Sequence, residues 1–489
     1  MKGSDHQTTR RTSRKEGESM LTPEILAALR AAVGEEWCLT SKADLMAYSY
    51  DATPLYQRLP DAVVLPRTTE EVAAVLQIAH AHRIPVFTRG AGTNLAAGTV
   101  PAGGGIVLSL NRMNRILEID QENLTATAEA GVITAELHKA VEAVGLFYPP
   151  DPGSMTSSTL GGNVMESAGG LRGLKYGVTK DYVMGLTAVT ADGRIFRAGG
   201  KNVKDVAGYD LVKLICGSEG TLCVVTEVIL KLLPMPEAKR TALAVFHDME
   251  AAARTVSRII AARIIPCTLE FMDNGTIRAV EDYVHLGLPT DAAALLLIQQ
   301  DGPASVCDAD IQRIAQICRE EGATRVEHAS DPAEQDRLMQ ARRFALSALA
   351  RRRPTTILED ATVPRSQIAP MVAEIQRIAQ KYDLDICTFG HAGDGNLHPT
   401  CMTDERNKEE IQRVEQAFAE IFAAALELGG TITGEHGVGE AKSPYLEWKV
   451  GPVGIELMKN IKKAFDPHGI LNPGKLFAGE TRKRVVVRQ

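Results

Sequence analysis

The sequence predicts an α+β fold of two or three domains, and three observations support this prediction. A strand–helix–strand pattern occupies residues 63–88 and leads into a glycine-rich loop. Pro234 and Pro236 then interrupt the chain and mark a boundary. From about residue 240 to 440, short strand-like runs alternate with longer helical ones, which is typical of an antiparallel sheet backed by helices.

The composition excludes several classes of protein. The chain has 489 residues, of which 45% are hydrophobic, so it can bury large cores. Its net charge of −7 offers no basic surface for nucleic acid, and no apolar run approaches the roughly 18 residues of a membrane helix. The eight cysteines form no Cys-x-x-Cys pair, so neither an iron–sulfur cluster nor a structural zinc site is expected. Because a disulfide framework is also not expected in so large a chain, a reducing, cytoplasmic setting fits best.

A polar extension precedes the folded chain. Residues 1–19 are polar and of mixed charge, and we expect them to be disordered. Arg10 and Arg11 are not followed by an apolar segment, which argues against an export signal. Thr22 and Pro23 are residue types that begin helices, so residues 20–57 are expected to form an N-terminal helical segment.

The first strand–helix–strand unit ends in a loop that suits a phosphate. Thr68 and Glu71 form a capping box for a helix that continues to Ala81, and a strand at 85–88 follows. The next residues, Arg89 to Gly98, resemble G-x-G-x-x-G, but Leu95 replaces the third glycine and no helix clearly follows. The pattern is therefore a weak dinucleotide fingerprint, yet it remains a credible loop whose backbone N–H groups face a phosphate.

Residues 157–170 are the densest small-residue region of the chain. Their Gly, Ser and Thr residues forfeit packing and raise the entropy cost of ordering the backbone. Two interpretations stay open: a long flexible loop, or backbone lying flat against an extended ligand such as a dinucleotide.

Hydrophobic patterns predict the other elements. In the first half we expect strands at 106–110, 124–128, 186–190 and 224–230, and a helix at 134–144. In the second half we expect strands at 242–246, 267–271, 294–299 and 355–358, and helices at 249–263, 309–321, 334–352, 367–381 and 408–428. The tail at 465–475 is rich in turn residues and is expected to pack on the first domain.

Two polar, glycine-flanked clusters carry the chemistry. In residues 389–400, FGHAGDGNLHPT, three glycines argue against a helix, so we expect a strand and a tight turn that brings two imidazoles together. Residues 433–439, TGEHGVG, add a glutamate and a third histidine. Two histidines and one glutamate are a usual ligand set for a catalytic divalent metal, which leaves one histidine for acid–base work.

Eight motifs in order resemble one family. RGAGTNLAAG, PDPGS, TLGGNV, AGG, GSEGTL, HAGDGNLH, GEHGVG and DPHGILNPGKLF cover nearly all of residues 40–477. Together they resemble the FAD-linked oxidases of the vanillyl-alcohol oxidase / p-cresol methylhydroxylase superfamily, in the branch of the glycolate oxidase flavin subunit and D-lactate dehydrogenase. The resemblance implies a two-lobed PCMH-type FAD-binding domain at 58–236, an α+β cap domain at 237–440 that covers the isoalloxazine, and a C-terminal segment at 441–489 that returns to the FAD domain.

The same resemblance implies the cofactor residues. FAD would lie along glycine-rich backbone, whose donors meet phosphate without bulky side chains in the way. Because Gly92-Thr93-Asn94 holds no histidine for a covalent link, the FAD is expected to be non-covalent, and Cys223, in place of the usual glycine, is expected to narrow or reshape the channel. The implied cofactor-binding residues are Arg89, Gly90, Ala91, Gly92, Thr93, Gly153, Ser154, Gly161, Gly162, Asn163, Gly169, Gly170, Glu219, Gly220, Thr221 and Asn472.

The implied reaction is oxidation of a 2-hydroxy acid, with hydride passing to flavin N5. By their place in the motifs, His391, His398 and Glu435 would hold a divalent metal, Zn²⁺ or Mn²⁺, that orients the substrate and lowers the pKa of its hydroxyl. His436 is the candidate base. Asn396 is the candidate substrate or outer-shell contact, and Asp394 the candidate partner of a ligand imidazole.

The carboxylate of a 2-hydroxy acid substrate is expected to bind an arginine guanidinium. Arg342 aligns with a family arginine in that role, and Arg343 is the alternative. Lactate- and hydroxyglutarate-type relatives often carry a Lys near residues 358–364. Its absence here argues against a dicarboxylate substrate and favours glycolate or D-lactate.

Blander interpretations accompany each assignment. A solitary histidine is more often structural, Arg342 could belong to a solvated helix face, and Asn472 could simply cap a turn. For the whole chain, the alternatives are a metal-free FAD alcohol or phenol oxidase and a flavin-bearing electron-transfer subunit. With no cluster-type cysteines, the expected electron acceptor is an iron–sulfur subunit, an electron-transfer flavoprotein or a quinone. The chain is expected in the cytoplasm or at the membrane periphery through a partner subunit.

Overall fold

The computed structural model describes residues 19–329 and 331–477. The predicted disordered extension therefore lies outside the described residues, apart from Ser19. Within these ranges the chain mixes helices with parallel and antiparallel sheets, and the predicted α+β class is confirmed. No helix in this part of the chain is both long enough and apolar enough to cross a bilayer.

The first sheet contains the predicted strand–helix–strand unit. Its order is β1 (Cys38–Leu39), β2 (Ala62–Val64), β4 (Ile106–Ser109) and β3 (Val86–Arg89), with β4 parallel to both β2 and β3. Helix α3 (Thr69–His82) begins where the capping box predicts, because the Thr68 side chain accepts a hydrogen bond from the Glu71 N–H. Helices α1 (Pro23–Val33) and α2 (Lys42–Ala47) complete this lobe.

A second sheet of five antiparallel strands lies beside the first. Its order is β5 (Ile116–Asp120), β6 (Thr125–Glu129), β10 (Val224–Lys231), β8 (Val183–Val189) and β9 (Ile195–Gly199). The helices of this lobe are α4 (Thr134–Glu142), α5 (Leu160–Glu166), α6 (Gly173–Tyr176) and α7 (Leu211–Ile215), and β7 (Leu146–Phe147) pairs with β11 (Leu233–Pro234).

Helix α5 corrects one interpretation of the small-residue region. Residues 160–166 are helical and not part of a long flexible loop, because Thr159 caps the helix by accepting from the Gly162 N–H at 3.2 Å.

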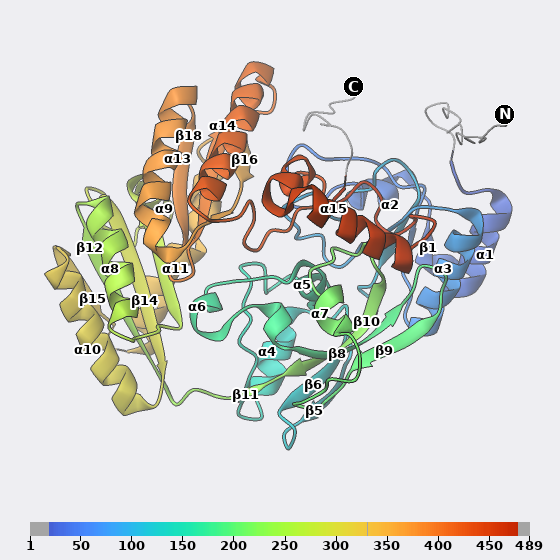
Figure 1. Ribbon diagram of the computed structural model, residues 1–489, viewed down its shortest axis with the longest axis horizontal. Coiled ribbons are helices and arrows are strands. Elements are labelled where there is room, and N and C mark those ends of the chain that lie inside the picture. The colour runs from blue at the N-terminus through green and yellow to red at the C-terminus, as the bar shows by residue number, and fades with distance from the viewer. Residues whose placement is uncertain (1–18, 330, 478–489) are drawn as a thin grey trace, which may run out of the picture.

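The largest sheet forms the second half of the molecule (Figure 1). It is antiparallel in the order β15 (Arg325–His328), β12 (Ala238–Phe246), β14 (Ala294–Gly302), β13 (Thr268–Asp273), β18 (Asp385–His391), β19 (Asn396–Thr403) and β16 (Thr355–Leu358), and β17 (Ala361–Thr362) also pairs with β19. One face packs on α8 (Met249–Ala261), α10 (Ala304–Glu320), α13 (Ile368–Tyr382) and α14 (Lys408–Glu427). The other face packs on α9 (Asn274–Val284), α11 (Pro332–Arg343) and α12 (Ala345–Leu349).

In the second half of the chain, three helical features differ from the sequence prediction. Helix α9 was not among the expected helices. The single helix expected at 334–352 is two helices, which meet at Phe344. Helix α15 (Leu446–Phe465) was also not expected, and it bends at Gly451, whose φ of +70° precedes Pro452.

The C-terminal tail lies against the first sheet. Leu471 bridges Val86 in parallel, and the Asn472 N–H donates to the Val86 carbonyl at 2.7 Å. In Figure 1, α15 lies on the same side of the molecule as α2 and β1. The domain boundaries expected at residues 58, 237 and 441 stay predictions.

Candidate functional site

The β18–β19 hairpin brings two histidines together. His391 is the last residue of β18, His398 lies in β19 opposite Phe389, and the two imidazole centroids are 5.1 Å apart. The turn requires Gly395, which has a φ of +87° and whose added Cβ would lie 2.0 Å from the Val363 carbonyl oxygen. The predicted strand and tight turn are confirmed.

Glu435 approaches both rings from the loop after α14. Its Oε1 lies 3.4 Å from His391 Nε2 and 3.3 Å from His398 Nε2. One ligand atom from each of the three residues lies within 4.8 Å of the other two. Two imidazoles and a carboxylate converging in this way fit a divalent metal such as Zn²⁺, because that donor set leaves positions open for a substrate. We call these three residues together with His436 the histidine cluster.

A buried glutamate, Glu270, supports the cluster from behind. Its Oε1 lies 2.7 Å from His391 Nδ1, and its Oε2 accepts from Arg342 Nε at 2.5 Å. A carboxylate behind a ligand imidazole fixes the ring orientation and raises its basicity. Asp394, the residue expected in this role, instead accepts from the Asn396 N–H at 3.1 Å. The sequence signal for Glu270 was an acid inside β13, a strand buried along its whole length.

The charges of the cluster depend on one another. Burial opposes a charged imidazole, but the carboxylates of Glu270 and Glu435 raise the pKa of His391 well above its usual value. Burial lowers the pKa of His398. The two imidazoles outweigh burial at Glu435 and hold its pKa well below the usual range. The positive charge of protonated His391 balances the same two carboxylates that a divalent cation would balance. Binding of a metal would therefore release the proton from His391.

Arg342 contacts Glu270 behind the cluster, and Arg343 does not. The Arg342 guanidinium lies 4.7 Å from the centroid of the Phe389 ring and is bound to buried Glu270. Arg343 pairs with Asp336 at the surface, where its side chain is 53% exposed.

His436 stacks on His398. The ring centroids are 5.4 Å apart and the planes differ by 6°. Its Nδ1 lies 3.5 Å from Asp360 Oδ1, an electrostatic contact longer than a hydrogen bond. Burial lowers the pKa of His436 to about 4, against the opposing effect of Asp360, so the ring is neutral at pH 7 but is a weaker base than an exposed imidazole.

Asp360 anchors the loop that carries Glu435 and His436. Its Oδ2 accepts from the Gly434 N–H at 2.6 Å and from the Glu435 N–H at 2.8 Å. Lys442, fully buried, forms an ion pair with its other oxygen. The sequence prediction gave neither Asp360 nor Lys442 a role, because the two residues lie 82 positions apart and no local pattern links them.

Asn396 also contacts this loop. Its Oδ1 accepts from Thr362 Oγ1 at 3.0 Å, and its Nδ2 would lie 2.9 Å from a Cβ added to Gly434.

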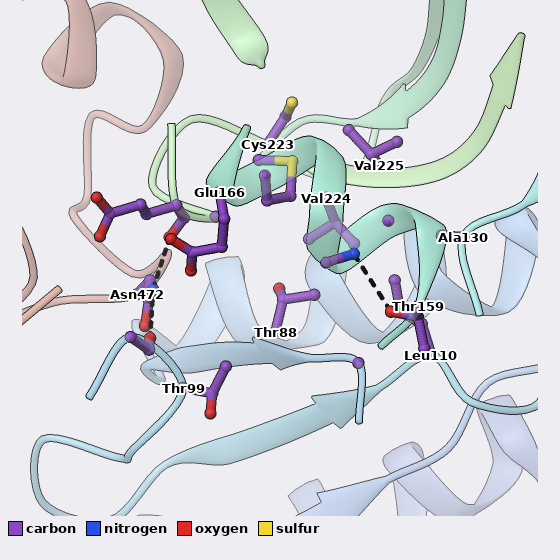
Figure 2. Close-up of a pocket in the computed structure, with 17 residues that line it drawn as sticks. Thr88, Thr99, Leu110, Ala130, Thr159, Glu166, Cys223, Val224, Val225 and Asn472 are labelled. Carbon is purple, nitrogen blue, oxygen red and sulfur yellow. Dashed lines mark hydrogen bonds between the residues drawn. The ribbon is translucent and has the colours of Figure 1, made fainter. Parts of the chain in front are cut away.

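A second site is a pocket between the first sheet, α5 and the start of β10, which we call the glycine-lined pocket (Figure 2). Six of the predicted cofactor residues line it: Gly90, Gly161, Gly162, Glu219, Gly220 and Asn472. Cys223 lines it as well, fully buried, and burial raises the pKa of its thiol to about 12. The sequence prediction missed the other lining residues, which are Thr88, Gly98, Thr99, Leu110, Ala130, Thr159, Met165, Glu166, Val224 and Val225.

The glycine-lined pocket fits a cofactor that lies close to backbone. A Cβ on Gly90 would lie 2.2 Å from Thr159 Oγ1, and one on Gly161 would lie 2.6 Å from the Ala130 Cβ. Three buried polar atoms in its lining, on Thr88, Glu166 and Asn472, have no hydrogen-bond partner among the described residues. Buried polar atoms normally find partners, so this lining suits a polar ligand such as the expected FAD.

The other predicted cofactor residues are not among those that line this pocket, and their role stays a prediction. Arg89 donates to the Tyr50 carbonyl at 2.6 Å, and Asn163 donates to Thr134 Oγ1 at 2.7 Å. Gly169 lies against the histidine cluster, because its added Cβ would be 2.6 Å from Glu435 Oε2. The remaining predicted residues outside the lining are Ala91, Gly92, Thr93, Gly153, Ser154, Gly170 and Thr221.

Two family models match this chain. The model described as "FAD binding domain" matches residues 60–199, and the one described as "FAD linked oxidases, C-terminal domain" matches residues 235–476.

Curated and solved proteins resemble it over nearly the whole length. The glycolate oxidase subunit GlcD of Bacillus subtilis is 60% identical over 96% of this chain and 100% of that protein. A D-lactate dehydrogenase of Anaerostipes hadrus is 36% identical over 88% of this chain and 92% of that protein. Among solved structures, p-cresol methylhydroxylase with substrate bound has a TM-score of 0.79 at 20% identity, covering 93% of this chain and 96% of that one, which shows a shared fold.

Proposed function

The chain belongs to the FAD-linked oxidases and is an oxidoreductase, and from this premise we propose that it oxidises a small 2-hydroxy acid, glycolate or D-lactate, to the 2-oxo acid. The family resemblance drawn from the motifs is confirmed. The names of the relatives, a glycolate oxidase subunit and a D-lactate dehydrogenase, support this substrate class.

One observation supports the proposal most strongly: the residues that could hold a metal lie in contact with the FAD-binding half of the chain. Gly169 lies directly against the carboxylate of Glu435, so a cofactor beside the 161–170 segment and a substrate at the histidine cluster would be neighbours. A hydrolytic metal site would not need this arrangement. Bound FAD would supply the hydride acceptor, its N5 atom. A divalent metal held by His391, His398 and Glu435 would supply Lewis acidity at the substrate hydroxyl.

Arg342 binds the substrate carboxylate in this proposal. Its Nε is taken by Glu270, which leaves the terminal nitrogens of a nearly buried guanidinium for a ligand. The planar fork suits two carboxylate oxygens.

His436 takes the hydroxyl proton. Asp360 lies on the Nδ1 side of the ring, so we assign the proton of the neutral ring to Nδ1 and the acceptor lone pair to Nε2. Stacking on His398 holds the ring beside the ligand set, and Asn396 lies close enough to the same loop to contact the substrate or orient the loop.

A redox partner completes the proposal. Since the eight cysteines are buried and none is in a disulfide, the reduced flavin would pass its electrons outward to an iron–sulfur subunit, an electron-transfer flavoprotein or a quinone. The word "subunit" in the name of the Bacillus subtilis relative supports such an assembly. The site of action would be the cytoplasm, or the membrane periphery through that partner.

An anaerobic screen tests the proposal. FAD-loaded protein is mixed with glycolate, D-lactate, L-lactate, D-2-hydroxyglutarate and p-cresol, and the flavin absorbance is followed. We expect glycolate or D-lactate to bleach it fastest. Bleaching by the phenol alone would indicate the metal-free oxidase, and no bleaching at all would indicate an electron-transfer subunit.

A pair of arginine variants sharpens the screen. Arg342→Lys should raise the KM for the acid by at least about tenfold, because a bidentate contact is lost, whereas Arg343→Lys at the surface should not. Equal effects of the two substitutions would remove Arg342 from substrate binding.

A further inference from the structure

Two carboxyl groups in the wall of the glycine-lined pocket, on half-buried Glu166 and on buried Glu219, have no part in the proposed chemistry. Glu166 ends α5, and Glu219 lies in the loop before β10. Glu166 Oε1 accepts from Asn94 Nδ2 at 2.7 Å, but its Oε2 is out of contact with solvent and has no hydrogen-bond partner in the part of the chain that is described. Figure 2 shows Glu166 at the pocket wall on the side of Asn472.

The two carboxyl groups crowd one point. A Cβ on Gly437 would lie 2.3 Å from Glu166 Oε2 and 3.1 Å from Glu219 Oε1. Asp51, also buried, adds a third carboxylate to the field at Glu166. The lysines that face Glu219 are engaged elsewhere, Lys442 with Asp360 and Lys475 with Glu440.

Glu219 is the better placed of the two to carry the negative charge. Its oxygens accept from the Val438 N–H at 2.7 Å and from the Gly439 N–H at 2.6 Å. Glu166 has one neutral amide donor and one oxygen without a partner. Two carboxylates this close and this buried do not both ionise, and the proton goes to the one with fewer donors. Burial raises the pKa of both groups, and the charge on Glu219 raises that of Glu166 further.

We propose that Glu166 and Glu219 share a single proton, and that Glu166 is a neutral acid whose Oε2 hydroxyl donates a hydrogen bond to the bound FAD. A neutral Glu166 removes the repulsion that a second carboxylate would exert on the cofactor's phosphates. It also gives Oε2 the partner it otherwise lacks. Glu219, as the anion, holds the backbone of Val438 and Gly439, so one pair serves both the cofactor wall and the loop of Glu435 and His436.

The proposal rests on FAD binding, which the family establishes, and not on the identity of the substrate. Its failure and the failure of the 2-hydroxy acid proposal are therefore separable, since the measurements below use no substrate.

The first experiment detects the proton. Infrared difference spectra of the full-length, FAD-loaded wild type against Glu166→Gln at pH 7.5 should show the carbonyl band of a protonated carboxylic acid that the variant lacks. Glu129→Gln is the matched control, because Glu129 is a buried glutamate in the same half of the molecule whose carboxylate pairs with Arg115. If Glu166→Gln removes only carboxylate bands, Glu166 is ionised and the proposal fails.

The second experiment detects the contact with FAD. Flavin is stripped from the full-length protein, and FAD is titrated back by quenching of its fluorescence. Glu166→Gln should bind FAD within about threefold of the wild type, because the amide N–H replaces the hydroxyl donor, while Glu166→Ala should bind at least about tenfold more weakly. Recovery of binding in Glu166→Gln separates the lost donor from a folding defect. Equal affinities of Glu166→Ala and the wild type would overturn the contact.

Discussion

The glycine-lined pocket and the histidine cluster belong to one proposed active site, yet the sequence builds them in different ways. The pocket depends on glycines, which have no side chain: a Cβ added to Gly90 would lie 2.2 Å from a neighbouring atom, and one added to Gly161 would lie 2.6 Å from one. The cluster is made by ionisable side chains that other side chains support from behind: Glu270 lies behind His391, and Asp360 lies beneath the loop of Glu435 and His436.

This difference determines how each region should respond to mutation. The glycines of the pocket have no room for a larger side chain, so substitutions that enlarge them should weaken cofactor binding through steric overlap. Each group of the histidine cluster depends on its hydrogen-bond and ionic partners. Substitutions in the cluster should therefore impair metal binding or proton transfer and leave the cofactor bound.

The largest effect is expected in the ligand set. His398→Ala removes one of three donors, so the protein purified without chelator should lose its bound metal, and flavin reduction by the acid should slow about 10³- to 10⁴-fold. Metal content by ICP-MS and anaerobic stopped-flow absorbance check this, with exposed His247→Ala as the control. A wild type that is active and free of metal would break the assignment of the cluster as a metal site.

A smaller effect is expected at the base. His436→Gln should keep both FAD and metal, since neither rests on this side chain, but should slow flavin bleaching by about 10²-fold or more. Rapid-mixing absorbance with a metal assay on the same sample measures both quantities. Bleaching at the wild-type rate would leave His436 with only a packing role against His398.

Asp360 tests whether the charged partners behind the cluster matter as much as the ligands do. Asp360→Asn removes the carboxylate that accepts hydrogen bonds from the N–H groups of this loop and pairs with Lys442. Metal affinity should therefore fall about 10- to 100-fold, while the flavin content stays the same. Competition with a chelator measures the affinity.

A matched variant keeps that test specific. Asp273→Asn changes another buried carboxylate that accepts two backbone N–H groups, from Thr276 and Thr388, outside the cluster. If both variants lose metal equally, general destabilisation explains the result and not the position of Asp360.

The smallest effect is expected in the pocket wall. Gly90→Ala places a methyl group onto Thr159 Oγ1, so FAD affinity should fall about tenfold while metal content is unchanged. Gly200→Ala is the control, because a Cβ there meets nothing within 4 Å. FAD titration of stripped protein gives the answer, and loss of metal together with FAD would erase the distinction between the two regions.

Much of the fold was predictable because local signals control it. The capping box at Thr68 and Glu71 sets the start of α3, and the glycines between His391 and His398 demand a turn. The prediction missed helices α9 and α15 and the helix within residues 160–166. In the last case Thr159 supplies a cap and tertiary packing outweighs the low helix propensity of two glycines.

The sequence by itself determined the family, the α+β class and the residues that could hold a metal, because glycine-rich motifs and His/Glu spacing are local and specific. Only the tertiary structure showed which side chains contact and support those residues. Glu270 reaches His391 from 121 positions away, and Glu166 meets Glu219 at Gly437. Such contacts form when sheets and loops pack, and burial then makes each charge depend on its neighbours, which no linear pattern of residues records.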